Sequence, residues 1–246
     1  MTDYRRQIDD AWDCLDRDEP GHAVVLARAI LDHRPEVIDA YVVLSAATEV
    51  RAEAIALLKE AVCVGAAFRK GEVAEDIPYD LDAHTRALGN LARLLWEAAR
   101  PGNRAEALRH ARLALRLDPN DRAGTRLLLM GWEASAGNWP AARRIVRRYS
   151  DERRTELRYW LALHAFRDGD ADADALLDTA IDTNPHVFAA LSGRLVALRL
   201  PDTSYSFGSP DEAALYAANA QDGWTATPGA LKWLTSRQPL ARVTLR

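Results

Sequence analysis

The sequence holds few cysteines, little net charge and no long apolar run. Cys14 and Cys63 are the only cysteines among 246 residues, and both lie in apolar stretches, so we expect two buried thiols in a reducing compartment. The first residues alternate charged with apolar side chains, and no apolar run approaches the ~18 residues that span a bilayer. The sequence therefore predicts neither a signal peptide nor a membrane helix, and we expect a cytoplasmic protein that contacts no membrane.

The charge balance argues against binding of nucleic acid or membrane by the chain's overall charge, while a local basic patch remains possible. The chain carries 32 lysines and arginines against 36 aspartates and glutamates, a net charge of -4. No chain-wide positive field is present to hold nucleic acid or an anionic membrane surface. With 48% apolar and 28% charged residues, the chain has enough apolar surface to bury a core as one large domain or two small ones.

The sequence also lacks the motifs of common enzymes. HExxH, CxxC, GxSxG, GxxxxGK and GxGxxG are all absent, and the six histidines are scattered singly. Four aspartates alternate over residues 168–174 like the start of a calcium-binding loop, but Ala173 and Thr179 stand where that loop needs glycine and glutamate. We interpret them as a favourable helix start. We expect no catalytic activity, no cofactor and no metal site.

What the chain does contain is a repeat of small residues. Three positions recur after 66 residues, which is twice 33: Ala107, Ala114 and Pro119 return as Ala173, Ala180 and Pro185. Ala54 and Ala61 show the same separation of seven residues. Seven residues make two helical turns, so these side chains share one helix face, where a neighbouring helix can approach closely. The prolines then end the helices.

This pattern predicts an all-α chain without strands. Apolar stripes of helical spacing fill the intervening segments, and glycines 102, 137 and 169 mark reversals of the chain. The predicted helical hairpins cover residues 3–33, 36–68, 83–117, 121–149, 154–183 and 187–220, with one more helix near 228–236. We predict a repeat array over 1–200 with an insertion loop at 69–82, a C-terminal helical cap over 201–238 and a tail over 239–246.

Some of these residues resemble a known family. Gly102, Ala107, Ala114 and residues 117–121 resemble the second half of a tetratricopeptide repeat (TPR), although bulky Leu95 replaces a small residue in the preceding helix. Residues 83–236 more narrowly resemble a group of bacterial tetratricopeptide proteins, distantly akin to the suppression-of-tumorigenicity-seven family. The resemblance implies a right-handed α-solenoid of five to six hairpins and no defined activity.

The family's period places a row of arginines on the concave side of such a solenoid. Its members are spaced by 33, 32 and 36 residues: Arg93, Arg126, Arg158 and Arg194. Trp96 and Met130 fall on the same expected face as apolar anchors. The row predicts a groove that grips carboxylates of an extended partner segment, while solvated arginines on a helix face are the alternative.

A second basic feature follows in the chain. Residues 143–158 hold seven arginines against three acids, and four of the arginines are spaced along one helix: Arg143, Arg144, Arg147 and Arg148. Pairing with acids of the adjacent hairpin explains them most simply. The alternative is an anionic partner, a protein or an RNA, although only Tyr149 is near enough to stack on bases.

Two further segments leave alternatives open. The acidic insertion at 69–82, with Pro78 and Tyr79 at its centre, is either a solvated linker or a lid that contacts a partner. Five aromatic residues over 205–233 predict either a cap on the last repeat or a docking pocket. The pairs Ser209–Pro210 and Thr227–Pro228 are typical of helix starts.

These observations favour a non-catalytic module for protein–protein interaction, an adaptor or scaffold that binds a segment of another protein, preferably an acidic one, in its concave groove. Two alternatives remain: a regulatory or accessory subunit of an enzyme complex, and an RNA-binding protein that uses the arginines of residues 143–158.

Overall fold

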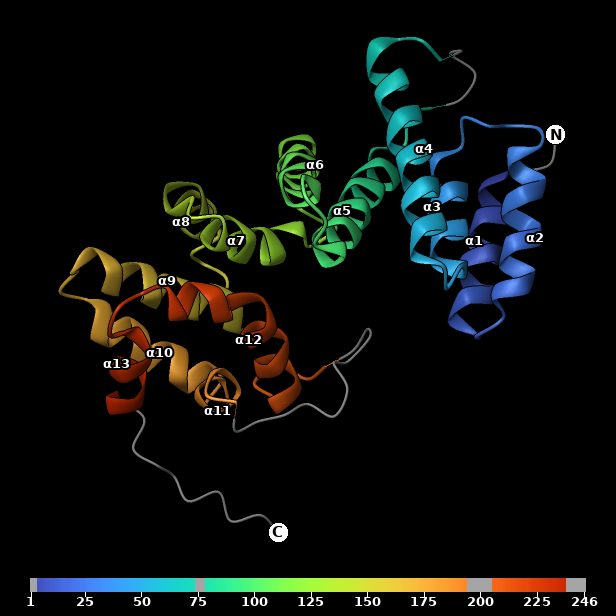
Figure 1. Ribbon diagram of the computed structural model, residues 1–246. Helices are drawn as coiled ribbons and strands as arrows, with labels where there is room; N and C mark the ends of the chain where they lie inside the picture. The colour runs from blue at the N-terminus through green and yellow to red at the C-terminus, as the bar shows by residue number, and fades with distance from the viewer. Residues whose placement is uncertain (1–3, 74–77, 194–204, 238–246) are drawn as a thin grey trace. The chain divides into compact units, whose positions relative to one another are not determined.

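The computed structural model describes residues 4–73, 78–193 and 205–237. All regular secondary structure in these ranges is α-helical, as predicted (Figure 1). The chain divides between Arg126 and Leu127 into two compact units, which we describe separately.

The first unit is built from helices that pack in three consecutive pairs, which can be followed in Figure 1. Their bounds are α1 Tyr4–Asp16, α2 Pro20–Leu31, α3 Ile38–Ala47, α4 Arg51–Lys70, α5 Leu81–Ala98 and α6 Asn103–Leu117. Each helix packs on the next one in the chain, and α3 also contacts both α1 and α5. The first helices of the three pairs therefore form one continuous layer, and the pairs lie within a few residues of the predicted spans.

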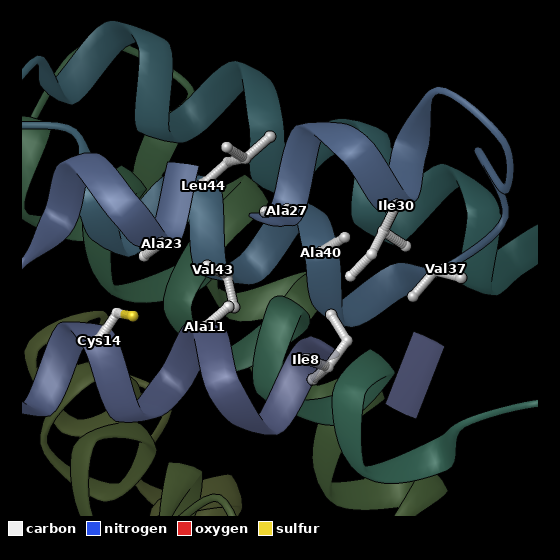
Figure 2. Packing of buried hydrophobic residues seen from close by; sticks show 10 residues of the cluster. All are labelled: Ile8, Ala11, Cys14, Ala23, Ala27, Ile30, Val37, Ala40, Val43 and Leu44. Carbon is white, nitrogen blue, oxygen red and sulfur yellow. The ribbon is translucent and has the colours of Figure 1, made fainter. Parts of the chain in front are cut away.

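Small residues occupy the contacts between these helices, as their spacing predicts. Ala54, Ala61, Ala107 and Ala114 are all at most 4% exposed. Figure 2 shows the equivalent contacts between α1, α2 and α3, where alanines alternate with larger apolar side chains. The labelled residues of this core are Ile8, Ala11, Cys14, Ala23, Ala27, Ile30, Val37, Ala40, Val43 and Leu44.

The prediction of two buried thiols is wrong for one of them. Cys14 is buried in the core of Figure 2, whereas Cys63 is exposed. Helix α4 buries the stripe that includes Ala54, Leu58 and Ala61, and Cys63 lies off that stripe. The residues around position 63 are apolar although α4 is only partly buried, so an apolar stretch of sequence did not imply a buried thiol.

Local signals explain where the helices begin and end. Asp80 caps α5, because its Oδ1 accepts a hydrogen bond from the Ala83 amide at 2.8 Å. Glycines 102, 137 and 169 all have positive φ, at 84°, 76° and 68°, and lie at chain reversals as predicted. The insertion between α4 and α5 is shorter than predicted, because α4 continues to Lys70.

The second unit contains the remaining helices, together with the body of α7, whose first two residues precede the division. Their bounds are α7 Thr125–Ser135, α8 Trp139–Arg148, α9 Thr155–Asp168, α10 Ala173–Thr183, α11 Val187–Leu191, α12 Pro210–Thr225 and α13 Ala230–Arg237. Helices α9 and α10 pack closely, α8 and α12 both contact α9, and α13 contacts α10 and α12. The predicted hairpin over 187–220 is realised differently: α11 has five residues, and α12 begins at Pro210.

Aromatic side chains of α12 pack on α9. Tyr216 is 2% exposed and Trp224 is fully buried, and both rings contact the ring of Tyr159. The hydroxyl of Ser209 accepts from the Glu212 amide, so the predicted helix start at Ser209–Pro210 is confirmed. Helix α13 begins two residues after Pro228.

A steric contact in the first unit provides a test of this packing. An ideal Cβ at Gly65 would lie 2.4 Å from ring atoms of His84, whose side chain is fully buried. We expect Gly65→Ala to lower the free energy of unfolding by about 1–3 kcal/mol, because the ring must shift within a packed core. Urea denaturation of the full chain measures this change.

Gly21→Ala is the matched control. Nothing lies within 4 Å of a Cβ at Gly21, which is also helical and in the same unit. Its stability should stay equal or rise by up to about 1 kcal/mol. Equal effects of the two substitutions would contradict the packing of α4 on α5.

Candidate functional site

The residues of the predicted arginine groove are divided between the two units. Arg93, Trp96 and Arg126 belong to the first unit, Met130 and Arg158 to the second, and Arg194 lies outside the described residues. Neither unit by itself contains the row.

The residues of the row in α5 engage neighbours within the fold. Arg93 is exposed and donates from Nη1 to Oε1 of Glu97 at 3.0 Å, and Glu97 also lies 3.7 Å from a guanidinium nitrogen of Arg51. Trp96 is half-buried, with the guanidinium of Arg104 5.0 Å from its ring centroid.

Arg126 has a structural position instead of the expected place in a groove. It is 9% exposed, and its Nη1 donates to Oδ2 of Asp121 at 2.8 Å and to the Asp121 carbonyl at 3.1 Å. The same carboxylate accepts from the backbone amides of Thr125 and Arg126 at the start of α7. The guanidinium therefore neutralises a buried carboxylate, and the expectation that Arg126 grips a partner is corrected.

The two residues of the row in the second unit, Met130 and Arg158, are buried to different extents. Met130 is fully buried, so it is a core residue and the expectation of an exposed apolar anchor is corrected. Arg158 is half-buried on α9. Burial in a core satisfies Met130 without any ligand.

The predicted basic patch lies on α8. This helix buries Ala141, Ala142, Ile145 and Val146 and leaves three of the four arginines exposed: Arg144, Arg147 and Arg148. Arg143 pairs with Asp168 at the end of α9, which is the pairing with an adjacent hairpin that the sequence favoured. The Arg148 guanidinium lies 5.5 Å from the centroid of the Tyr149 ring.

The first unit contains a pocket of about 560 Å³ that the sequence did not predict. It lies where α1, α3 and α5 begin, next to the end of α4 and residues 78–80. Three aromatic side chains line it: Tyr4, Phe68 and Tyr79. Five carboxylates also line it, namely Asp9, Glu36, Asp39, Asp80 and Asp82, against two guanidiniums, those of Arg5 and Arg122.

One of these carboxylates joins all three first helices. Asp39 of α3 accepts from Trp12 Nε1 of α1 at 3.0 Å and from Arg86 Nη1 of α5 at 2.7 Å. The Arg86 guanidinium also lies 5.3 Å from the Trp12 ring centroid. This clamp of Trp12, Asp39 and Arg86 holds one wall of the pocket in register.

A second ion pair lies at the start of α5. Arg122 donates to Asp82 Oδ2 at 2.8 Å and, through Nε, to Asp118 Oδ2 at 3.3 Å. Asp118 also accepts from the backbone amide of Arg122, and this hydrogen bond is the largest cause that lowers the pKa of its carboxyl. Arg122 is therefore committed to two carboxylates of the fold.

The aromatic wall of the pocket, Phe68 and Tyr79, is held by contacts with a residue outside the lining. The rings of Phe68 and Tyr79 lie 5.7 Å apart, and the Tyr79 oxygen is 2.7 Å from His84 Nδ1. Burial raises the pKa of the Tyr79 hydroxyl, so it stays protonated within hydrogen-bond distance of this nitrogen. Burial, with the Arg69 charge adding to it, lowers the pKa of His84 to about 4, so the imidazole is neutral at pH 7.

A second buried imidazole lies in the other unit. His164 is 4% exposed, its ring lies 5.6 Å from that of Trp139, and burial lowers its pKa to about 4. Within the described residues, no three His, Cys, Asp or Glu side chains are grouped closely enough to hold a metal ion.

Sequence comparisons provide no relative for this chain. No protein-family model matches it, and no curated protein sequence matches it either. Among the helices of the described residues, none combines the length and apolarity needed to cross a membrane.

The position of Arg126 makes the first prediction of this section. Asp121 is 5% exposed, and Arg126→Ala leaves its carboxylate with only backbone donors. We expect the free energy of unfolding to fall by about 3 kcal/mol, because a buried charge loses its partner. Urea denaturation measures the effect. Arg116→Ala, on an exposed position of α6, should change stability by less than about 0.5 kcal/mol; a similar small change for Arg126→Ala would contradict the structural role.

The second prediction concerns pH. The folded pKa of His84, about 4, lies below the ordinary value of 6.5, so its favourable contribution is present above pH 6.5 and is lost as the pH falls toward 4. The stability difference between wild type and His84→Gln should shift against wild type by about 2 kcal/mol between pH 7.5 and pH 5. Urea denaturation at each pH measures this, and His164, present in both proteins, cancels. Parallel pH profiles for the two proteins would contradict the buried, neutral imidazole.

Proposed function

We propose that this chain is a non-catalytic, TPR-like helical-repeat module that binds a segment of a partner protein in the pocket at the starts of α1, α3 and α5. The observation that carries the proposal is the pocket itself, with its volume of about 560 Å³. This lies within the range of ~300–1,000 Å³ that is usual for ligand sites.

The packing of the first unit supports a stacked-repeat architecture. Pairs contact their neighbours in sequence, and the first helices contact one another: α1 with α3 and α3 with α5. In helical-repeat proteins such a layer forms an extended binding surface, to which every repeat contributes. The pocket takes residues from all three first helices, as binding in such a layer requires.

The walls of the pocket support binding without a large rearrangement. The clamp of Trp12, Asp39 and Arg86 fixes one wall, and the contact of Tyr79 with His84 fixes the aromatic one. A site whose side chains are already held in place loses little conformational entropy when a ligand binds. Tyr79 and Asp80 belong to the acidic insertion, so we favour a partner-contacting role for that part of it over a solvated linker.

The alternatives remain predictions of lower weight. The exposed Arg144, Arg147 and Arg148 on α8 support an anionic partner such as RNA. Among the described residues, Tyr149 is the aromatic side chain that one of these three arginines contacts. A role as an accessory subunit of an enzyme complex is compatible with the same pocket, because it also requires a bound partner.

Site-specific crosslinking tests the proposal. The full chain carries p-benzoylphenylalanine in place of Tyr79 and is expressed in cells that make it naturally. We expect crosslinks to one defined segment of one protein, identified by mass spectrometry, because Tyr79 lines the pocket and is 36% exposed.

The same probe in place of Val25 is the control. Val25 is 66% exposed on α2 and does not line the pocket. The segment found from Tyr79, made as a peptide, should bind the purified chain and should not be crosslinked from Val25. No defined segment from Tyr79, or the same proteins from both positions, would refute binding in the pocket.

A further inference from the structure

We propose that the pocket selects a cation, the arginine or lysine side chain of a basic segment in a partner protein. This inference rests on the proposed function and adds the chemistry of the ligand. It reverses the charge of the partner that the arginine row suggested, since Arg126 is buried against Asp121.

The charge of the lining is the first step. Five carboxylates and two guanidiniums line the pocket, which leaves three net negative charges. Two of the carboxylates are already paired, Asp39 with Arg86 and Asp82 with Arg122. An arginine from outside the lining thus neutralises Asp39, and Arg122 of the lining is engaged by Asp82.

The roles of the remaining acids are the second step. Three helix starts meet here, and acids near such starts are favoured by the helix dipole without any ligand. That explanation covers Asp80, which caps α5, and Asp39 and Asp82, which lie in the first turns of α3 and α5. The helix dipole does not explain Asp9, which lies in the second turn of α1. It does not explain Glu36 either, which lies two residues before the first residue of α3.

Asp9 and Glu36 carry the proposal for this reason. Neither side chain forms an ion pair or a side-chain hydrogen bond with any part of the chain that the structure describes, and both line the pocket. Carboxylates that the fold itself does not use form charge-assisted hydrogen bonds with an incoming ammonium or guanidinium. In addition, Asp82 Oδ1 is buried and accepts no hydrogen bond from the described residues.

The aromatic lining is the third step, because it suits the rest of such a side chain. Arginine and lysine carry an apolar stem below the charge, and aromatic rings contact both the stem and the cation. Phe68 and Tyr79 provide two adjacent rings, and Tyr79 is held by His84. The chain already uses this contact next to the pocket, where the Arg34 guanidinium lies 5.5 Å from the Tyr4 ring centroid.

The experiment selects random 12-residue peptides by phage display on the purified full chain and measures their affinity by fluorescence anisotropy. We expect the selected peptides to contain arginine or lysine. The variant Asp9→Asn/Glu36→Gln should bind them at least about tenfold more weakly, which corresponds to about 1.4 kcal/mol. Replacing the basic residue by its neutral isostere, citrulline for arginine, should remove the difference between variant and wild type.

The matched control is Asp10→Asn/Asp32→Asn. Both residues are exposed, lie in the first unit and are outside the pocket, so the net charge changes equally. This control should bind within about twofold of wild type, which separates contact in the pocket from general attraction of a basic peptide to the chain. Thermal unfolding of both double variants verifies that they fold like wild type.

The possible failures are distinguishable. Selected peptides without basic residues, or equal binding to the two double variants, would overturn the cation selectivity. If such peptides still compete with crosslinking from position 79, the pocket binds peptides and the proposed function stands. If no peptide responds to Tyr79→Ala either, the proposed function fails together with the inference.

Discussion

The close approach of neighbouring helices at buried alanines is the constraint on which the first unit depends. A side chain that ends at Cβ lets two helix backbones approach to the short end of the usual 8–10 Å. Ala27, Ala40, Ala61 and Ala87 are all fully buried, so no larger side chain separates the layers there. Close pairs can then stack, and the beginnings of α1, α3 and α5 come together to enclose the pocket.

Apolar packing of this kind allows neighbouring helices more than one alignment along their axes, and polar contacts reduce the number of allowed alignments. The clamp of Trp12, Asp39 and Arg86 can form only when α1, α3 and α5 have one mutual alignment, and Arg122 ties the start of α5 to Asp118, at the end of α6. Partly buried ion pairs of this kind add little net stability. Their effect is to fix where the carboxylates and rings of the pocket stand, which a binding site needs more than the fold does.

Local signals were sufficient to predict the helices, and insufficient to predict which side chains face solvent. Spacings of seven residues, prolines and glycines act within one or two turns, so the five pairs up to residue 183 were predicted to within a few residues, while the hairpin predicted over 187–220 was not. The burial of Arg126 depends on Asp121, which has a positive φ of 52° and turns its carboxylate toward the start of α7. The pocket has no contiguous motif either, because its residues come from five separated segments between Tyr4 and Arg122. The TPR resemblance itself stays a prediction.

The charge of the expected partner shows why position matters more than composition. Arginines outnumber lysines strongly in this chain, and the spacing of four of them suggested an acidic ligand, yet Arg126 of that row is engaged by Asp121. Arg86 and Arg122, outside the row, are engaged by carboxylates of the fold too. At physiological ionic strength, charges more than ~8 Å apart in solvent are largely screened from each other. A side chain inside the pocket therefore responds to the groups that line it, and among these Asp9 and Glu36 form no ion pair with the described residues. The net charge of the whole chain, -4, therefore matters less to a basic side chain in the pocket than these two carboxylates do.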